Sequence, residues 1–477
     1  MLKIAALLPL LAIFTLGDNL QAKEMISDIS DQTGLAVTIY NENLALIRDQ
    51  RAVSLPGNTV DLALRGVSAR MRPETALLRS IDHPDDLQVL EQNFNFDLLT
   101  PDKMLEKYTG QTVEIIRMNP ATGKETREAA TILSTNEGVV AEIGGRVETN
   151  PEGRWIFPRI PENLRDRPTL VTHLNTQKSG KRELELTYLS GGLSWKADYV
   201  VNLSEDDRSL DLAGWVTLTN KSGTSYPNAH LQLVAGDVNQ VRDNMRHMRK
   251  SAGMAVAEAT PAPMAEESLF EYHLYTLNRP TSIADNQTKQ VALLNASGVP
   301  AHKELVIQGQ DYYYRNRYDS LGSKLKASAW LIFENREKSG LGMPLPKGIV
   351  RVYKEDSKGN AQFVGEDRID HTPKNEQLRL KLGESFDVTA NRKQTAYRKV
   401  NFGHPYRYAA EASFRIELKN AKSSPTTVSV QEPIPGDWEM LHESRKHRKL
   451  SSNLVEWQVE IPAEGNVILE YQVRVRY

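Results

Sequence analysis

Hydrophobic and polar residues alternate along most of this chain with the two-residue period of a β-strand. The C-terminal segment shows the pattern most simply, because polar side chains separate the apolar residues Val467, Leu469, Tyr471, Val473 and Val475. Successive side chains of a strand point to opposite faces of its sheet, so this pattern predicts a strand with one buried and one solvated face. The same alternation recurs at residues 184–188, 195–203, 378–382 and 410–418.

Gly, Asn, Asp, Ser and Pro residues separate these segments, which is typical of antiparallel sheets with short connections. A sheet with one apolar face must cover that face with a second layer. We therefore expect an all-β protein of two or three antiparallel β-sandwich or barrel-like modules with few short helices. The repeated segments 210–233 and 414–430 each predict a hairpin whose turn begins at Asn220 or Asn420.

One short helix is predicted at residues 101–108. Thr100 is a suitable N-cap, Pro101 suits the first helical position, and Gly110 follows the end. The apolar face of this helix would carry Met104, Leu105 and Tyr108. These features predict a connector of about two turns rather than a core element.

The chain has 477 residues, a length that suggests about three domains. We expect an N-terminal β region with the connector helix, a small barrel-like β subdomain, a β-sandwich with a mobile loop at 239–267, and a C-terminal β-sandwich. Their predicted ranges are 23–108, 109–175, 176–300 and 301–477. The alternative for the small subdomain is a plain sheet extension of the N-terminal region.

The first 22 residues predict a signal peptide. Lys3 gives a positive start, residues 4–16 are almost entirely apolar, and Ala22 is a small residue that suits cleavage. This apolar run is shorter than the roughly 20 residues that cross a bilayer. We expect cleavage after Ala22, with an uncleaved anchor as the alternative, and a periplasmic or secreted protein with no transmembrane span after cleavage.

Composition narrows the classes of partner. The chain has 59 Lys and Arg residues against 61 Asp and Glu residues, so its net charge predicts no nucleic-acid partner. It has no cysteine, which excludes disulfides and thiolate ligands. Charged residues make up 25% of the chain, as in an ordinary globular protein.

Several short motifs resemble catalytic or metal-binding patterns but differ from them in spacing or in predicted secondary structure. His442 and His447 are five residues apart, whereas a zinc-binding pair on a helix is four apart. The acidic residues within 366–376 would alternate between the two faces of a strand. Ser323 and Lys326 precede a predicted strand instead of lying on a helix. The sequence therefore predicts no catalytic residue, no metal ligand and no cofactor.

One segment is a candidate ligand-binding surface. Within seven residues it holds four tyrosines and two arginines, which are Tyr312, Tyr313, Tyr314, Arg315, Arg317 and Tyr318. Aromatic rings offer flat apolar faces, and guanidinium groups donate planar pairs of hydrogen bonds to carboxylates or hydroxyls. This composition suits a glycan or a peptide. The alternative is a half-buried strand.

Five stretches carry a resemblance to a known family, and they are residues 188–199, 218–223, 231–238, 365–373 and 382–388. In these stretches the chain resembles the bacterial domain of unknown function 4139, and the likeness extends from about Val37 to the C-terminus. The resemblance implies an exported or periplasmic β-rich protein and no catalytic residue. A distant branch of the family is labelled mucoidy inhibitor and has a long coiled coil, for which this chain has no heptad run.

Together these features predict an exported, envelope-associated protein that acts as a binding or structural module. Its partner would be envelope polysaccharide or another envelope protein. One alternative is a hydrolase of cell-wall or polysaccharide substrates, because paired carboxylates need only meet in space. A second alternative is an assembly partner that adds an edge strand to another protein.

Overall fold

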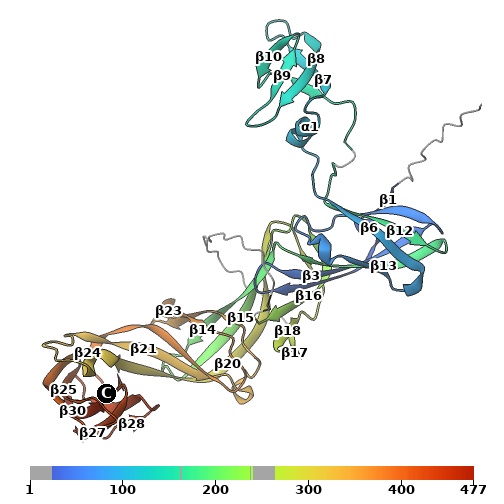
Figure 1. Cartoon of the computed structure of the whole chain (residues 1–477). Coiled ribbons are helices and arrows are strands. Elements are labelled where there is room, and N and C mark those ends of the chain that lie inside the picture. The colour runs from blue at the N-terminus through green and yellow to red at the C-terminus, as the bar shows by residue number, and fades with distance from the viewer. Residues whose placement is uncertain (1–23, 162–163, 237, 240–263) are drawn as a thin grey trace, which may run out of the picture. The chain divides into compact units, whose positions relative to one another are not determined.

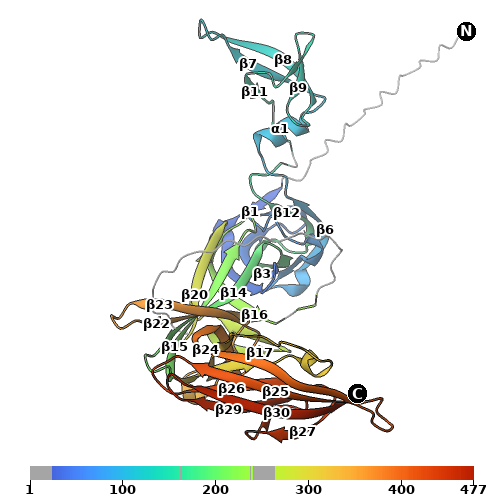
Figure 2. The same cartoon turned by 90° about the vertical axis from the view of Figure 1, so that its left-hand side faces the viewer.

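The computed structural model describes residues 24–161, 164–236, 238–239 and 264–477 (Figures 1 and 2). The predicted signal peptide and residues 240–263 of the predicted loop lie outside these ranges. The structure is 61% strand and 5% helix, with several separate sheets, so the all-β prediction is confirmed. Among the described residues, no helix is both long enough and apolar enough to span a membrane.

Two compact units make up the chain, and neither is continuous in sequence. The described part of the first unit comprises residues 24–37, 45–192 and 221–229. The second unit comprises residues 38–44, 193–220 and 230–477, apart from the undescribed positions. The predicted domain ranges remain predictions.

Two sheets form the larger part of the first unit. One has the order β1-β4-β12-β6, with β1 (Met25–Ser27), β4 (Thr59–Arg65), β12 (Thr169–Thr176) and β6 (Leu87–Asn95). The other belongs to an eight-stranded sheet, in which β2 (Gln32–Tyr40), β3 (Ala45–Leu55), β13 (Gly180–Ser190) and β5 (Leu77–Ser80) are neighbours in that order. Short 3₁₀ helices are η1 (Ile29–Asp31), η2 (Pro73–Thr75) and η3 (Pro84–Asp86). Leu184, Leu186 and Tyr188 of β13 are buried, as their alternation predicts.

A small antiparallel sheet in the same unit has the order β10-β9-β8-β7-β11. Its strands are β7 (Thr112–Met118), β8 (Glu125–Ser134), β9 (Val140–Ile143), β10 (Arg146–Thr149) and β11 (Arg154–Ile156). The helix α1 (Pro101–Lys107) begins as predicted, because the Thr100 hydroxyl accepts a hydrogen bond from the Lys103 amide at 3.2 Å. Met104, Leu105 and Tyr108 pack in one cluster with apolar residues of β7 and β8. The small sheet is separate and does not extend the four-stranded sheet of β1, β4, β12 and β6.

The segment that carries α1 and the small sheet leaves and rejoins the rest of the unit at one place. Leu98 and Arg165 form a parallel β-bridge. The Leu99 amide donates to the Arg165 carbonyl at 2.8 Å, and the Arg165 amide donates to the Asp97 carbonyl at 3.0 Å. The ends of the segment are therefore adjacent.

The second unit begins with long paired strands. The order β23-β22-β14-β15-β20 joins β23 (Ala361–Ile369), β22 (Gly348–Glu355), β14 (Leu193–Leu203), β15 (Ser209–Asn220) and β20 (Gln287–Gln308). The strands β17 (Ala265–Leu269) and β18 (Tyr272–Thr276) form a hairpin beside β16 (Tyr226–Ala235), which also pairs with β19 (Thr281–Ile283). Trp195, Ala197, Tyr199 and Val201 of β14 are buried on one face, as predicted.

The C-terminal part of this unit encloses a large apolar core. One layer contains β21 (Leu325–Glu334), β24 (Gln377–Val400), β25 (Ala409–Asn420), β30 (Asn466–Arg476) and β27 (Asp437–Glu443). The other contains β26 (Thr426–Pro433), β29 (Leu454–Ile461) and β28 (Arg448–Lys449), with β26 parallel to the end of β20. The 3₁₀ helices are η4 (Asp311–Tyr314) and η5 (Glu337–Ser339). Phe414, Tyr471 and Trp457 lie in this core, and the Tyr471 ring stacks on both of the others.

The two predicted hairpins are wrong, because β15 does not pair with β16 and β25 does not pair with β26. The first connection leads from one sheet to another, and the second joins two strands of one 13-stranded sheet that are not neighbours in it. Asn420 is buried, and its side-chain amide donates to the Ser424 carbonyl at 2.9 Å and the Pro462 carbonyl at 3.0 Å. Asn220 is equally buried and donates to the Ala284 carbonyl at 3.0 Å. Each asparagine therefore ties the end of its own strand to the residue that follows a distant strand, β19 or β29.

We predict that Asn420→Ala lowers the free energy of unfolding by about 1–3 kcal/mol, because it leaves two partly buried carbonyl groups without this donor. Denaturant titration of the purified protein measures this change. The matched control is Asn401→Ala, since Asn401 is exposed. An equal effect of the two substitutions would contradict a structural role for the buried amide.

Candidate functional site

The six residues of the predicted tyrosine and arginine patch are divided between surface and interior. Residues 311–314 form the 3₁₀ helix η4 rather than a strand. Tyr312 is 45% exposed, whereas Tyr313 and Tyr314 are 5% and 0% exposed. Arg315 and Arg317 are exposed, and Tyr318 is partly buried. A 3₁₀ turn directs neighbouring side chains to different sides, which explains the division.

Tyrosines from other strands join the exposed part of this patch. The rings of Tyr312 and Tyr318 lie 5.5 Å apart, edge to face, and the rings of Tyr408 and Tyr477 stack at 5.2 Å. The Tyr397 hydroxyl donates to the carbonyl that follows η4, that of Arg315, at 2.7 Å. We call the group Tyr312, Tyr318, Tyr397, Tyr408 and Tyr477 the tyrosine surface, and each of its members is at least partly exposed.

Strand pairing explains why three of these tyrosines meet. Tyr397 is near the end of β24, Tyr408 precedes β25, and Tyr477 follows β30. In the ladder, Val400 pairs with Ala409, and Ala409 pairs with Arg476. Neighbouring strand ends therefore bring together residues that are about 80 positions apart in the chain. No local sequence motif contains Tyr397, Tyr408 and Tyr477, so the sequence alone did not indicate that they join the patch.

Partial burial and mutual proximity raise the pKa of two of these phenols, those of Tyr477 and Tyr397. Burial, followed by the neighbouring Tyr408 and Tyr397, raises the pKa of Tyr477 to about 12. The pKa of Tyr397 is also raised, by burial first and then by Tyr408 and Tyr318. A protonated phenol both donates and accepts hydrogen bonds. The Lys399 ammonium adds a positive charge 5.1 Å from the centre of the Tyr408 ring.

A buried ionic network lies beneath this surface. The Arg392 guanidinium donates to Glu432 at 2.5 Å, and both side chains are 0% exposed. The Tyr314 hydroxyl lies 3.1 Å from the Glu432 carboxylate, to which it donates, and 3.0 Å from the Tyr471 hydroxyl. Arg392 also donates to the Tyr313 hydroxyl at 3.3 Å. The two buried tyrosines of η4 are thus fixed by one ion pair, and η4 in turn presents Tyr312.

Burial raises the pKa of the Glu432 carboxyl above its ordinary value, and the Arg392 charge opposes that rise. For Arg392, burial alone would lower the pKa of the guanidinium, but Glu432 and the nearby tyrosines raise it overall. An ion pair of this kind is strongly destabilising when one partner is removed, because the other is left as an uncompensated buried charge. The network therefore has a structural role.

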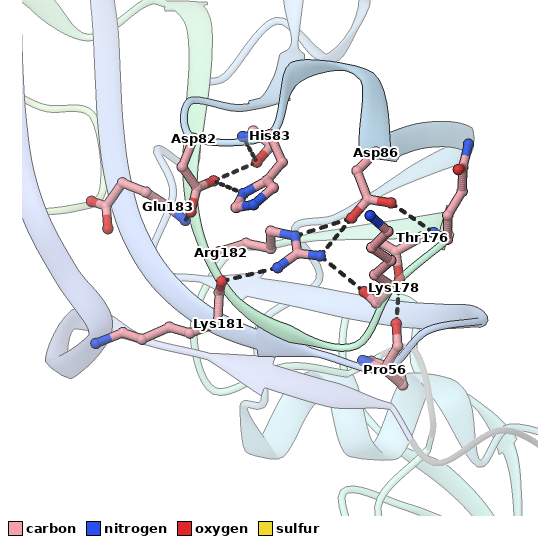
Figure 3. Close-up of polar contacts among 11 residues, drawn as sticks. Pro56, Asp82, His83, Asp86, Thr176, Lys178, Lys181, Arg182 and Glu183 are labelled. Carbon is pink, nitrogen blue, oxygen red and sulfur yellow. Dashed lines mark hydrogen bonds and ion pairs between the residues drawn. The ribbon is translucent and has the colours of Figure 1, made fainter.

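A second polar cluster lies in the first unit, where η3 meets the start of β13 (Figure 3). Arg182 donates through Nη2 to Asp86 at 2.5 Å and to the Lys178 carbonyl at 3.0 Å, and through Nη1 to the Lys181 carbonyl at 3.1 Å. The hydrogen bond from Arg182 lowers the pKa of Asp86. The Arg182 guanidinium donates these hydrogen bonds to groups within the same unit, so the cluster stabilises the turn that precedes β13.

Asp82 lies near that cluster and is exposed to solvent (Figure 3). Its carboxylate accepts from the Ser80 hydroxyl at 2.7 Å and lies 3.2 Å from the His83 ring. The Ser80 hydrogen bond, ahead of that from His83, lowers the pKa of Asp82 to about 2. A carboxyl that is ionised at every physiological pH does not act as a general acid.

Among the residues that the structure describes, no three His, Asp or Glu side chains are close enough together to hold a metal ion. His447, one of the two histidines tested above, contacts Glu443 at 2.8 Å. The Trp457 indole donates to the same carboxylate at 3.0 Å. Glu443 therefore connects a surface loop to the core.

Comparison with protein families gives one match, to a domain of unknown function, DUF4139, over residues 184–477. The chain belongs to this family. No curated protein matches the chain. The DUF4139 match covers the tyrosine surface and the buried Arg392–Glu432 pair. The resemblance expected between about Val37 and residue 183 lies outside the match and stays a prediction, as does the distant mucoidy-inhibitor likeness.

We predict that Arg392→Met destabilises this DUF4139 protein by about 3–5 kcal/mol near neutral pH, because Glu432 is left unpaired in the core. The folded state binds a proton at Glu432 more readily than the unfolded state does, since its pKa is raised by burial. The stability that this carboxyl contributes is therefore present in acid and is lost as the pH rises through its folded pKa. Removing Arg392 raises that pKa further, so the loss should be smaller in acid than at neutral pH.

Denaturant unfolding of wild type and variant, once in acid and once at neutral pH, measures the loss of stability at each pH. Arg415→Met is the matched control, because Arg415 pairs with Glu470 on the surface, where both side chains are about half exposed. An exposed pair contributes little to stability. A loss for Arg392→Met that is equal at the two pH values would argue against a charged Glu432.

Proposed function

We propose that this protein is an exported binding module of the bacterial envelope and that its tyrosine surface holds a polysaccharide chain. The single observation behind the proposal is the gathering of five partly exposed tyrosines from η4, β24 and the ends of β25 and β30. Sugar rings have apolar C–H faces that pack on aromatic rings, and their hydroxyls need donors and acceptors at the ring edges. The tyrosine surface offers both.

Charge and rigidity support the same assignment. Arg315 is exposed and its side chain pairs with Asp311 at 2.6 Å, so its charge is already compensated locally. The phenols of Tyr397 and Tyr477 are protonated at neutral pH, because burial and neighbouring tyrosines raise their pKa values. The surface is therefore polar without being strongly charged, which suits a glycan better than a highly charged peptide. Because strands and a buried ion pair fix the rings, little side-chain entropy is lost when a ligand binds.

The proposal is tested by isothermal titration of the purified protein with soluble oligosaccharides of β-linked hexoses and of N-acetylhexosamines. Tyr312→Ala and Tyr408→Ala should each weaken binding about tenfold, which corresponds to about 1.4 kcal/mol per ring. Both substitutions truncate side chains with an exposed face, so the fold should be retained.

Phe386→Ala is the matched control, because Phe386 is an 87% exposed aromatic residue outside the tyrosine surface. It should leave affinity unchanged. Binding that survives both tyrosine substitutions, or that is weakened equally by the control, would exclude the tyrosine surface as the glycan site. Absence of binding to either oligosaccharide series would count against the proposed function itself.

A further inference from the structure

The hairpin of β17 and β18 ends in an exposed apolar tip. Leu269 pairs with Tyr272, so Phe270 and Glu271 form a two-residue loop. Phe270 is 87% exposed and Leu269 is 44% exposed. The tip belongs to the second unit and shares no residue with the tyrosine surface.

Phe270 also has an unfavourable backbone conformation. Its φ angle is +57°, a left-handed value that is uncommon for a bulky aromatic residue. Two-residue hairpin loops with positive φ favour Gly, Asn or Asp at such a position. The chain thus places a large apolar side chain in solvent at a position where a glycine would be less strained.

The base of the hairpin is firmly held. Tyr275 and Leu274 are buried, and the Tyr275 hydroxyl donates to the Pro344 carbonyl at 2.9 Å. The Tyr272 ring lies directly against Gly236, where a side chain would collide with it. The ring of Phe270 lies 6.2 Å from that of Tyr272. The tip is therefore a fixed projection on an anchored hairpin.

We propose that Phe270 and Leu269 insert into the interface of a phospholipid bilayer. Two side chains bury at most a few hundred Å², with about 150–250 Å² for one aromatic residue. A stable protein interface needs about 800 Å² from each partner. The residues around the tip are polar, namely Glu267, Ser268 and Glu271, so they do not extend the apolar area. A bilayer interface accepts a single aromatic side chain without a complementary surface.

The charges at the tip determine the type of lipid. Glu267 and Glu271 are exposed beside Phe270, whereas Glu266 is paired with His273 at 2.8 Å. Carboxylates are repelled by an anionic surface. The hairpin should therefore contact a membrane surface of zwitterionic phospholipid and avoid an anionic one.

Because the chain has no cysteine, a single introduced cysteine carries a fluorescent label at one known position. Ser268→Cys, labelled with an environment-sensitive dye, reports on the tip. Ser423→Cys is the matched control, because Ser423 lies in an exposed turn that carries no large apolar side chain. Each labelled protein is mixed with phosphatidylcholine vesicles, with and without added phosphatidylglycerol.

We expect a blue shift and an intensity increase for the label at position 268 with phosphatidylcholine, a smaller change when phosphatidylglycerol is added, and none at position 423. Adding Phe270→Gly should abolish the change at position 268. That variant should fold at least as stably as wild type, because glycine suits the positive φ. No shift at 268, equal shifts at both positions, a shift that persists without Phe270, or a stronger response to anionic lipid would each overturn the proposal.

Discussion

The buried pairing of Arg392 with Glu432 is the interaction on which the C-terminal part of the molecule most depends. It joins β24 to β26 across the core, and through Tyr313 and Tyr314 it fixes η4. Hydrophobic residues of similar volume often replace such a pair with no loss of stability. What an apolar core cannot supply is the set of directional bonds that orients a four-residue 3₁₀ helix. The pair is best understood as a device for positioning.

That positioning explains how an exposed aromatic surface arises on a protein made mainly of strands. A sheet displays side chains at fixed intervals, but its faces here are mostly buried or charged. The aromatic residues gather instead at the ends of β24, β25 and β30 and on the 3₁₀ helix beside them. Strand ends tolerate substitution better than strand centres, so the residues of this surface can change while the core is kept.

Much of the fold was predictable from the sequence, because each strand carries its own local signal. The alternation in β13, β14, β25 and β30 identified their buried faces, and the capping residues identified α1. The hairpins at Asn220 and Asn420 were predicted wrongly, since a turn signal does not say which sheet the next strand joins. For the candidate site, the cluster of tyrosines and arginines at 312–318 was evident in the sequence, but its division between surface and interior was not. Tyr397, Tyr408 and Tyr477 depend on strand pairing, which is a long-range property.

The adjacent ends of the segment that carries α1 and the small sheet have an evolutionary consequence. Because Asp97, Leu98 and Leu99 meet Arg165 directly, the surrounding strands β6 and β12 would need almost no rearrangement if the intervening residues were lost, exchanged or duplicated. The intervening segment could therefore be replaced by another with little change to the strands on either side. This part of the molecule lies outside the family match at 184–477.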